Sequence, residues 1–267
     1  MNILILYSGG LDSAIMKRYA EVKYPEANIE LLYVNLGHDY AYKEMATLDS
    51  TVDVLELKLP SAANPVGKDG SSSGNIIIPG RNLLLAVVGA CLKQPDQVWL
   101  GALMGEIHAG STDKNTTFRD KLNDTLSYVF SPFDTIPQVV FPFVDADMGK
   151  LEITEWALAN GFTKEQLMST SSCLTGEPGN CGTCVVCTRR WGIFDQLGFE
   201  ETYNRHPVFA VDAPIDMYLE MVRGEMGQEC HYDEYRRREI VPALLKLFNT
   251  NDYSVLYNML ETRKQQQ

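Results

Sequence analysis

Residues 2–13 read Asn-Ile-Leu-Ile-Leu-Tyr-Ser-Gly-Gly-Leu-Asp-Ser, and this stretch decides the fold. Its first six residues form a short, nearly continuous apolar run, which is typical of a strand buried on both faces of a parallel sheet. Ser8-Gly9-Gly10 ends the run, and apolar residues then recur at helical spacing up to the residue before Pro25. The stretch therefore predicts a buried strand, a tight glycine turn and a helix.

The same alternation of strands and helices continues along the chain, which predicts a parallel sheet in an α/β fold. The next strand is expected at 29–35, and a helix at 83–92, apolar throughout, is expected to be buried. The other expected elements are helices at 40–50, 116–130 and 150–160 and strands at 53–59, 97–102 and 141–144.

A glycine pair between a buried strand and a helix exposes backbone N–H groups at the positive end of the helix dipole. Phosphate oxygens suit such a turn, Ser8 and Ser13 add hydroxyl donors, and Asp12 can hold a Mg²⁺ that offsets phosphate charge. The turn lacks the Lys of the common Gly-x-x-x-x-Gly-Lys phosphate loop. The hypothesis is therefore that this turn binds the phosphates of ATP as a phosphate loop of another type. The alternative is an ordinary strand-to-helix turn that is capped by serine.

Four cysteines lie close together in the sequence with spacing Cys-x7-Cys-x2-Cys-x2-Cys, namely Cys173, Cys181, Cys184 and Cys187. Four thiolates suit tetrahedral Zn²⁺, whereas local disulfides at these spacings would be strained. An iron–sulfur cluster is the alternative. Cys91 is expected to be a small core residue, and Cys230, although it precedes His231, lacks an evident third group for catalysis.

The composition is that of a globular protein with a strong negative charge, −12 at pH 7. This charge disfavours free nucleic acid and anionic membranes as partners, although a local basic pocket at Arg189-Arg190 or at residues 236–238 stays possible. No apolar run approaches the roughly 20 residues of a membrane-spanning helix. With no signal-peptide pattern, the protein is expected in the cytoplasm.

Three parts are expected along the chain: residues 1–165 for the nucleotide domain, 166–198 for the four-cysteine segment and 199–267 for a mainly helical extension. Residues 61–75 are rich in Gly, Ser, Asn and Pro, and we expect a loop there that covers a site. In the extension, a helix through Tyr235 and Phe248 is expected to start or break near Pro242.

Several short motifs, in one order, resemble the QueC family of 7-cyano-7-deazaguanine synthases within the PP-loop ATP pyrophosphatases. The resemblance runs from residue 1 to about Gly198. The motifs are Ser-Gly-Gly-Leu-Asp-Ser at 8–13, Ile-Pro-Gly-Arg-Asn at 78–82, Lys-Leu-Glu-Ile at 150–153, Ser172-Cys173 and Cys-Gly-Thr-Cys-Val-Val-Cys at 181–187 with Arg190 and Phe194 after it.

The resemblance implies a doubly wound parallel sheet with a zinc-binding segment, usually in a homodimer, and a place in queuosine biosynthesis. It implies a ligase that adenylates the carboxylate of 7-carboxy-7-deazaguanine with ATP, lets ammonia displace AMP, and adenylates the amide to reach the nitrile, preQ0. By the same resemblance, pyrophosphate binds residues 8–13, including Gly9, Gly10 and Leu11, and Arg81 and Asn82 line the nucleotide or substrate pocket. A surface salt bridge is the alternative for Arg81, and Lys150 and Glu152 could simply face solvent.

The sequence departs from the family in two places. Where the family usually has Asp-x-Ser-Gly-Tyr-x-Asp-Cys, residues 108–115 read His-Ala-Gly-Ser-Thr-Asp-Lys-Asn. Asp113 is the candidate for gripping the guanine-like edge, because a carboxylate can accept two N–H bonds, and capping of the next helix is the alternative. The second departure is the extension, which could be a lid, a dimer arm, a docking surface or extra core.

These departures keep other functions open. The main alternative is a ligase that passes the adenylated carboxy-deazaguanine to an amine of a partner protein. Sulfur or amide transfer to tRNA would need a basic groove, which the acidic composition disfavours. The last alternative is a nucleotide sensor or structural zinc module without catalysis.

Overall fold

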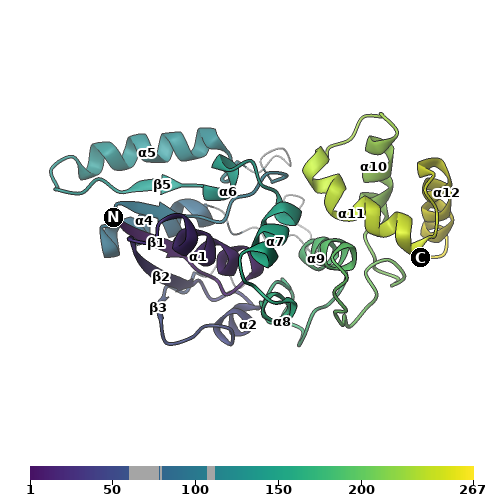
Figure 1. Ribbon diagram of the computed structural model, residues 1–267, viewed down its shortest axis with the longest axis horizontal. Helices are drawn as coiled ribbons and strands as arrows, with labels where there is room; N and C mark the ends of the chain where they lie inside the picture. Colours follow the sequence, from purple (N-terminus) through teal and green to yellow (C-terminus); the bar gives the residue numbers. More distant parts are fainter. Residues whose placement is uncertain (60–77, 79, 107–111) are drawn as a thin grey trace. The chain divides into compact units, whose positions relative to one another are not determined.

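The computed structural model describes residues 1–59, 78, 80–106 and 112–267 (Figure 1). The chain divides into two compact units: the first comprises residues 1–148 and 153–171, the second residues 149–152 and 172–267. The predicted loop at 61–75 lies outside the described residues. Among the described residues no helix is long and apolar enough to cross a membrane.

The predicted parallel α/β fold is confirmed, because the described part of the first unit contains a five-stranded sheet in which every pairing is parallel. The strand order is β3-β2-β1-β4-β5. Ile5 in β1 lies opposite both Leu31 in β2 and Trp99 in β4, which places β1 at the centre of the sheet. The strand bounds are Asn2–Leu6, Asn28–Asn35, Val52–Glu56, Gln97–Trp99 and Gln138–Val140 for β1 to β5.

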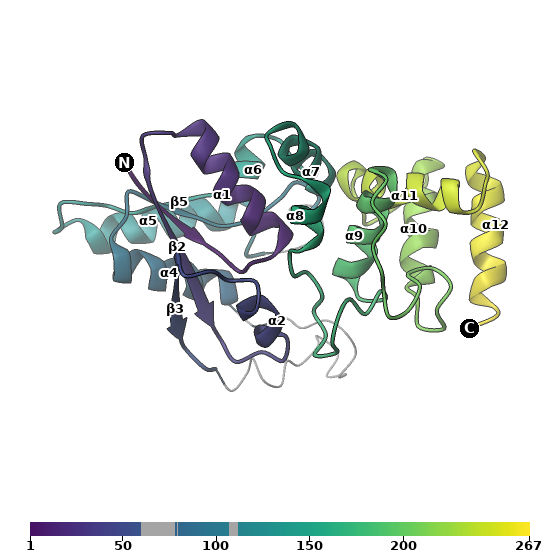
Figure 2. The ribbon, with the colours of Figure 1, turned by 60° about the horizontal axis from the view of Figure 1, so that its bottom comes forward.

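Helices cover both faces of this sheet (Figure 2). On one face α1 (Leu11–Lys23) packs through Tyr19, whose ring contacts Trp99, Phe143 and Trp156. On the other face lie α4 (Arg81–Lys93) and α5 (Thr116–Phe130), whose apolar side chains share a core with β4 and β5. The other described helices before residue 172 are α2 (Ala41–Met45), α6 (Pro142–Asp145), α7 (Lys150–Ala159) and α8 (Lys164–Met168).

Several predicted elements were wrong in type or length, among them the strands expected at 53–59 and 97–102, which end at Glu56 and Trp99. The strand expected at 141–144 is the helix α6, and the strand β5 lies just before it, because Pro142 has the fixed φ and missing N–H that suit the first turn of a helix. The helix expected at 40–50 ends at Met45. The Thr47 hydroxyl donates to the Glu44 carbonyl at 2.7 Å and so competes with the helical bonding pattern.

The apolar helix α4 is less buried than its composition predicted. It buries Ala86, Gly89 and Ala90 against the sheet, while Leu83 and Leu92 are about half exposed. Cys91 is exposed as well, so its interpretation as a core residue was wrong. A helix without polar side chains from 83 to 92 gives no periodic signal, and the sequence therefore could not show which face is buried.

The second unit is mainly helical and has its own core. Its helices are α9 (Val185–Gln196), α10 (Ile215–Glu225), α11 (Glu234–Leu247) and α12 (Tyr253–Lys264). Tyr218, Ile240, Leu256 and other side chains from α10, α11 and α12 form one buried apolar cluster, against which Trp191 of α9 packs. The predicted helical extension thus consists of packed helices with an apolar centre, and α9 packs against them.

Helix α11 runs through Pro242 without a break, contrary to the prediction. Proline cannot donate to the carbonyl four residues earlier, which here belongs to Arg238. The Gln196 side chain in α9 contacts that carbonyl through Nε2 at 3.1 Å, and the Glu239 carbonyl at 2.9 Å. A neighbouring helix therefore supplies the hydrogen bond that the proline removes, and the helix continues.

The basic pocket that the sequence left possible at Arg189-Arg190 is absent from the described residues, because both side chains are buried in ion pairs. Arg189 makes two 2.6 Å bonds to the carboxylate of Glu239, which is fully buried. Arg190 binds Glu201 at 2.7 Å and lies over the Phe194 ring. These guanidinium groups connect helices and loops inside the second unit.

Two arginines of the basic run at 236–238 also form ion pairs with acidic neighbours. Arg237 binds Glu225 at 2.8 Å, and Arg238 binds Glu152 at 2.9 Å. The sequence analysis left open that Lys150 and Glu152 simply face solvent. Lys150 is instead buried, and Glu152 is held in the ion pair with Arg238.

Removal of either partner of the Arg189–Glu239 pair should strongly destabilise the second unit. Glu239→Gln leaves a buried guanidinium without its counter-charge, and we expect a loss of about 3 to 5 kcal/mol in urea unfolding followed by circular dichroism. The double variant Arg189→Met/Glu239→Leu should lose less than Glu239→Gln, because it leaves no buried charge.

The matched control is the exposed pair of Arg205 and Glu177, 2.8 Å apart with side chains 38% and 48% exposed. Glu177→Gln should cost less than about 1 kcal/mol, because water screens that pair. Equal losses for Glu177→Gln and Glu239→Gln would contradict the assignment of the buried pair as a structural link.

Candidate functional site

The turn between β1 and α1 can be built only with glycine at position 9. Gly9 has φ +70°, which side-chain-bearing residues rarely adopt. A Cβ there would lie 1.9 Å from the Thr47 hydroxyl oxygen. The Gly9 carbonyl accepts hydrogen bonds from Ser171 N at 3.1 Å and from Thr47 at 3.4 Å. The turn is therefore fixed by contacts from two distant segments of the first unit.

Hydrogen bonds within this turn hold its two serine hydroxyls beside α1. The Ser13 hydroxyl donates to the Gly10 carbonyl at 3.0 Å and accepts from Ser8 N at 3.2 Å. The Ser8 hydroxyl oxygen accepts from Gly10 N at 3.4 Å. Gly10, the N-cap of α1, has no side chain that could cap the helix, and an anion at this end would face the positive end of the helix dipole.

A cavity of about 210 Å³ opens beside this turn. It lies where the strand order reverses, between the carboxyl ends of β1 and β4, because its lining includes Leu6 and Tyr7 on one side and Leu100 and Gly101 on the other. Ligands bind at this switch point in open α/β sheets. Of the residues predicted for a site, the structure brings five to the cavity lining: Ser8, Asp12, Ser13, Arg81 and Asn82.

The cavity also has a polar group that sequence reasoning missed. His38, just after β2, and Glu44 in α2 both line it, with His38 Nε2 2.8 Å from Glu44 Oε2. The Tyr33 hydroxyl donates to the same oxygen at 2.9 Å. Burial, and then the Glu44 carboxylate, raises the pKa of Tyr33, so its hydroxyl stays protonated. The signal available in the sequence was polar residues after a buried strand.

Arg81 begins α4 and contacts Tyr40, whose ring packs against that of His38. Its guanidinium lies 3.5 Å from the Tyr40 hydroxyl. Burial raises the pKa of Tyr40 although Arg81 acts in the other direction, so the phenol remains neutral. Lys114, which forms a 3.0 Å ion pair with Glu106, also lines the cavity. Two cationic side chains, those of Arg81 and Lys114, thus line a cavity that also holds the Asp12 and Glu44 carboxylates, and the cations can bind an anionic ligand.

Asp113 does not line the cavity. Its backbone carbonyl accepts from the Asn82 side chain at 3.1 Å. The alternative interpretation of Asp113 as a helix cap was wrong, because Asn115 caps α5 by accepting from Phe118 N at 2.8 Å. Residues 108–111 of the divergent stretch lie outside the described residues.

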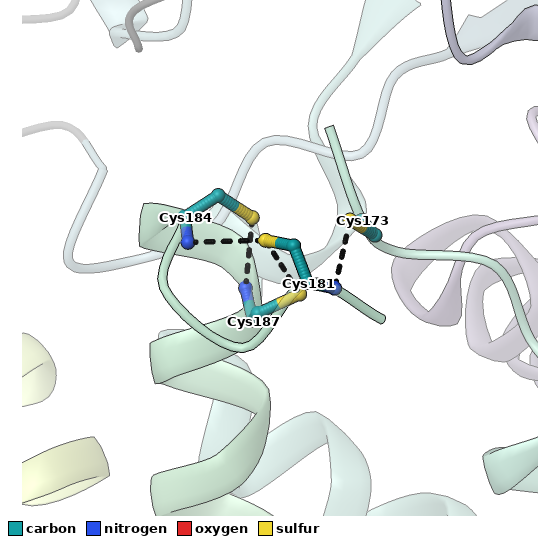
Figure 3. Close-up of side chains that lie close together, drawn as sticks. All are labelled: Cys173, Cys181, Cys184 and Cys187. Atoms are coloured by element: carbon teal, nitrogen blue, oxygen red, sulfur yellow. Dashed lines mark hydrogen bonds between the residues drawn. The ribbon is translucent and has the colours of Figure 1, made fainter. Parts of the chain in front are cut away.

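The four clustered cysteines meet at the start of α9 (Figure 3). Their sulfur atoms all lie within 4.8 Å of one another, and Cys173, Cys181 and Cys187 are buried. Backbone N–H groups of Cys181, Cys184 and Cys187 donate to sulfur at 3.3 to 3.4 Å. Donation from the other three thiols lowers the pKa of Cys173. Hydrogen bonds with neighbouring sulfurs raise the pKa of Cys184 and of Cys187 instead, so without a metal the cluster does not hold four thiolates, the form that binds metal.

A loop of the second unit closes tightly over these cysteines. Gly182 has φ +91°, and a Cβ there would lie 1.8 Å from the Arg205 carbonyl oxygen. Tyr203 packs against the sulfur cluster and donates to Glu201, which in turn binds Arg190. Tyr203 thus connects the sulfur cluster to the buried ion pair of Arg190 and Glu201. The four cysteine sulfurs are close enough to bind one metal ion.

Cys230 and His231 do not form a reactive pair of the kind weighed from sequence. His231 is exposed and binds Glu220, with Nδ1 2.5 Å from the carboxylate. The Cys230 thiol instead donates to the Tyr232 carbonyl at 3.3 Å. The sequence did not show that Glu220 could orient the His231 imidazole. The described interactions include no contact between that imidazole and the Cys230 thiol, so the three residues do not form a catalytic set.

Known proteins resemble this chain over most of its length. A family model described as queuosine biosynthesis protein QueC matches residues 56–198, more than half of the chain. A 7-cyano-7-deazaguanine synthase of Pyrococcus furiosus is 27% identical over 248 residues, covering 74% of this chain and 95% of the relative. A Halobacterium salinarum protein of the same name is 27% identical over 238 residues, covering 79% and 96%.

One similar solved structure is that of the U34-tRNA thiolase NcsA from Methanococcus maripaludis with its 4Fe-4S cluster. Its sequence is 16% identical to this chain, and the superposition covers 61% of this chain and 58% of the thiolase with a TM-score of 0.37. The family model supports a stronger statement, because its match includes Arg81-Asn82 at the cavity and all four clustered cysteines. This chain belongs to the QueC family.

Proposed function

We propose that this protein converts 7-carboxy-7-deazaguanine to 7-cyano-7-deazaguanine with ATP and ammonia, through an adenylated carboxylate. The observation that supports this most directly is the cavity at the switch point of the sheet, where the serine turn and Arg81 lie together in a QueC-family chain. A carboxylate is a poor electrophile, whereas its mixed anhydride with AMP has a good leaving group. The reaction then needs no side-chain nucleophile, and positioning carries much of the catalysis.

In this proposal the β1–α1 turn binds the phosphates. The Ser8 and Ser13 hydroxyls line the cavity next to the first turn of α1, which begins at Leu11 and directs the positive end of the helix dipole toward a bound phosphate. Gly9 and Gly10 let phosphate approach the backbone. The Asp12 carboxylate lines the same cavity and would hold Mg²⁺, which prefers oxygen ligands and spreads charge on the departing pyrophosphate.

Arg81 and Asn82 are proposed to line the nucleotide or substrate part of the cavity. The Arg81 guanidinium suits a carboxylate or a phosphate, because its donors match two oxygens at once. Asn82 holds the segment after residue 111 through the Asp113 carbonyl. Recognition of the guanine-like edge by the Asp113 carboxylate stays a proposal.

Transfer to an amine of a partner protein is the second candidate function. The QueC family model ends at residue 198, whereas this chain continues with three helices around their own core. An added packed surface of this kind suits docking of a protein that accepts the adenylated carboxylate in place of ammonia.

Three further expectations from the sequence also stay predictions. They are a homodimer, a cytoplasmic location and the division of the chain at residues 165 and 198.

We also propose that the four cysteines bind zinc. Zn–S bonds of about 2.3 Å in a tetrahedron place the sulfurs about 3.8 Å apart. The Cys181 and Cys187 sulfurs are 3.9 Å apart, and all four lie within 4.8 Å of one another. An iron–sulfur cluster inserts several atoms between its cysteines and would hold them farther apart. The spacing therefore favours one tetrahedral ion.

Incubation of the protein with ATP, Mg²⁺, ammonia and 7-carboxy-7-deazaguanine should yield AMP, pyrophosphate and the nitrile, identified by mass spectrometry. Asp12→Asn or Ser13→Ala should lower AMP formation by roughly 10²- to 10³-fold, because each removes a group aimed at charge that develops on the phosphates. Ser127→Ala, on the exposed side of α5, is the matched control and should not change the rate.

Product masses separate the candidate functions. A partner protein that gains the mass of the carboxy-deazaguanine acyl group, with no free nitrile, would favour the protein ligase. ATP that binds without pyrophosphate release in the presence of the carboxylate would contradict both functions and favour a nucleotide sensor.

Metal analysis should find close to one zinc per chain in the purified protein. Cys187→Ser should lose that zinc, because it removes one of four ligands, whereas Cys91→Ser and Cys230→Ser should keep it. Iron and inorganic sulfide in place of zinc would show that the alternative cluster is correct.

A further inference from the structure

One imidazole at the cavity has a free nitrogen that the proposed roles above do not use. The His38 ring lines the cavity with its side chain only 6% exposed, and Nε2 is bound to Glu44. The other ring nitrogen, Nδ1, is buried and has no hydrogen-bond partner among the described residues. Buried polar atoms are almost always paired in proteins, so an unpaired one at a cavity marks a place where a ligand or a water molecule can bind.

The contacts of His38 determine which nitrogen carries the proton. The Glu44 Oε2 atom accepts from the Tyr33 hydroxyl at 2.9 Å and lies 2.8 Å from Nε2. A carboxylate can only accept hydrogen bonds, so Nε2 carries a proton and Nδ1 of the neutral ring presents a lone pair. The Tyr40 ring, with its centroid 4.1 Å from that of His38, restricts rotation of the imidazole.

The proposed reaction needs a proton acceptor beside its nitrogen atom. Ammonia enters with three protons, and the nitrile nitrogen leaves with none. We propose that His38 is a further catalytic residue, whose Nδ1 accepts these protons during attack by ammonia and during formation of the nitrile. This inference rests on the proposed function and adds to it the group that moves the protons.

The proton transfers balance as follows. When ammonia adds to the acyl adenylate, a C–N bond forms, one proton passes from nitrogen to Nδ1, and AMP leaves with the electrons of the broken C–O bond. The amide oxygen then bonds to the α-phosphorus of a second ATP, which expels pyrophosphate, while a second proton leaves nitrogen. Loss of the third proton forms the last C–N bond and expels AMP. His38 returns each proton to water between steps.

Glu44 and Tyr33 are positioning residues in this arrangement, because they contact the imidazole or its partner. The Glu44 carboxylate fixes the tautomer and stabilises the imidazolium that forms, and the Tyr33 hydroxyl fixes the carboxylate. Glu44→Gln should therefore slow the nitrogen steps less than removal of the imidazole, while adenylation continues.

A single-turnover experiment can test His38 because the proposed proton transfers follow the first adenylation. In His38→Ala, the first release of pyrophosphate from ATP and 7-carboxy-7-deazaguanine should match the wild type. Nitrile formation should fall by roughly 10²- to 10⁴-fold, with the adenylate or the amide accumulating. Added imidazole should restore nitrile formation in proportion to its concentration, which a purely structural role of His38 would not allow.

The matched control is His231→Ala, in the second unit, which should keep both rates. Nitrile formation by His38→Ala at the wild-type rate would overturn the proposal. Equal loss of pyrophosphate release and nitrile in that variant, with no effect of imidazole, would also overturn it and assign His38 to binding. If the wild type itself releases no pyrophosphate with this substrate, the proposed function fails and the inference fails with it.

Discussion

The turn between β1 and α1 depends on the missing side chain at position 9. The positive φ of Gly9 lets the chain turn sharply from β1 into α1 while it packs against Thr47. A Cβ at position 9 would clash with the Thr47 hydroxyl oxygen. The Gly9 carbonyl is held from two directions, by Ser171 N and by the Thr47 side chain. Because this turn is fixed, the Ser8 and Ser13 hydroxyls and the first N–H groups of α1 have defined positions before any ligand arrives.

The strand order then determines which distant residues meet that turn. After β3 the chain crosses to the other side of β1, so that β4 lies beside β1 although nearly a hundred residues separate them. The ends of β1, β2 and β4 therefore border one cavity, and the segments that follow β2 and open α4 supply His38 and Arg81 to it. Parallel strands put all their carboxyl ends at one edge, which is why a single pocket collects polar groups from so much of the sequence.

The sequence predicted the parts of this fold that have a local signal. The buried strand and glycine turn at 2–13 and the cysteine spacing at 173–187 are dense local patterns, and a parallel sheet and a four-sulfur group are present. Phe141–Val144 was misread because four apolar residues fit a strand or a helix, and only Pro142 pointed to the latter. His38 was missed because only its contacts with Glu44 and Tyr33 distinguish it from other polar residues after β2, and no spacing in the sequence shows those contacts.

The second unit shows why net charge and residue type say little about local surfaces. Arg189 and Arg190 read as a basic patch, yet both are buried against Glu239 and Glu201. The close approach of α9 and α11 requires Gly192, where a Cβ would lie 2.3 Å from the Glu239 carbonyl oxygen. That approach also brings Gln196 to the carbonyl that Pro242 leaves without a donor. The close contact between α9 and α11 therefore pairs the charge of Arg189 with that of Glu239 and lets α11 continue through Pro242. The sequence of either helix alone predicts neither effect.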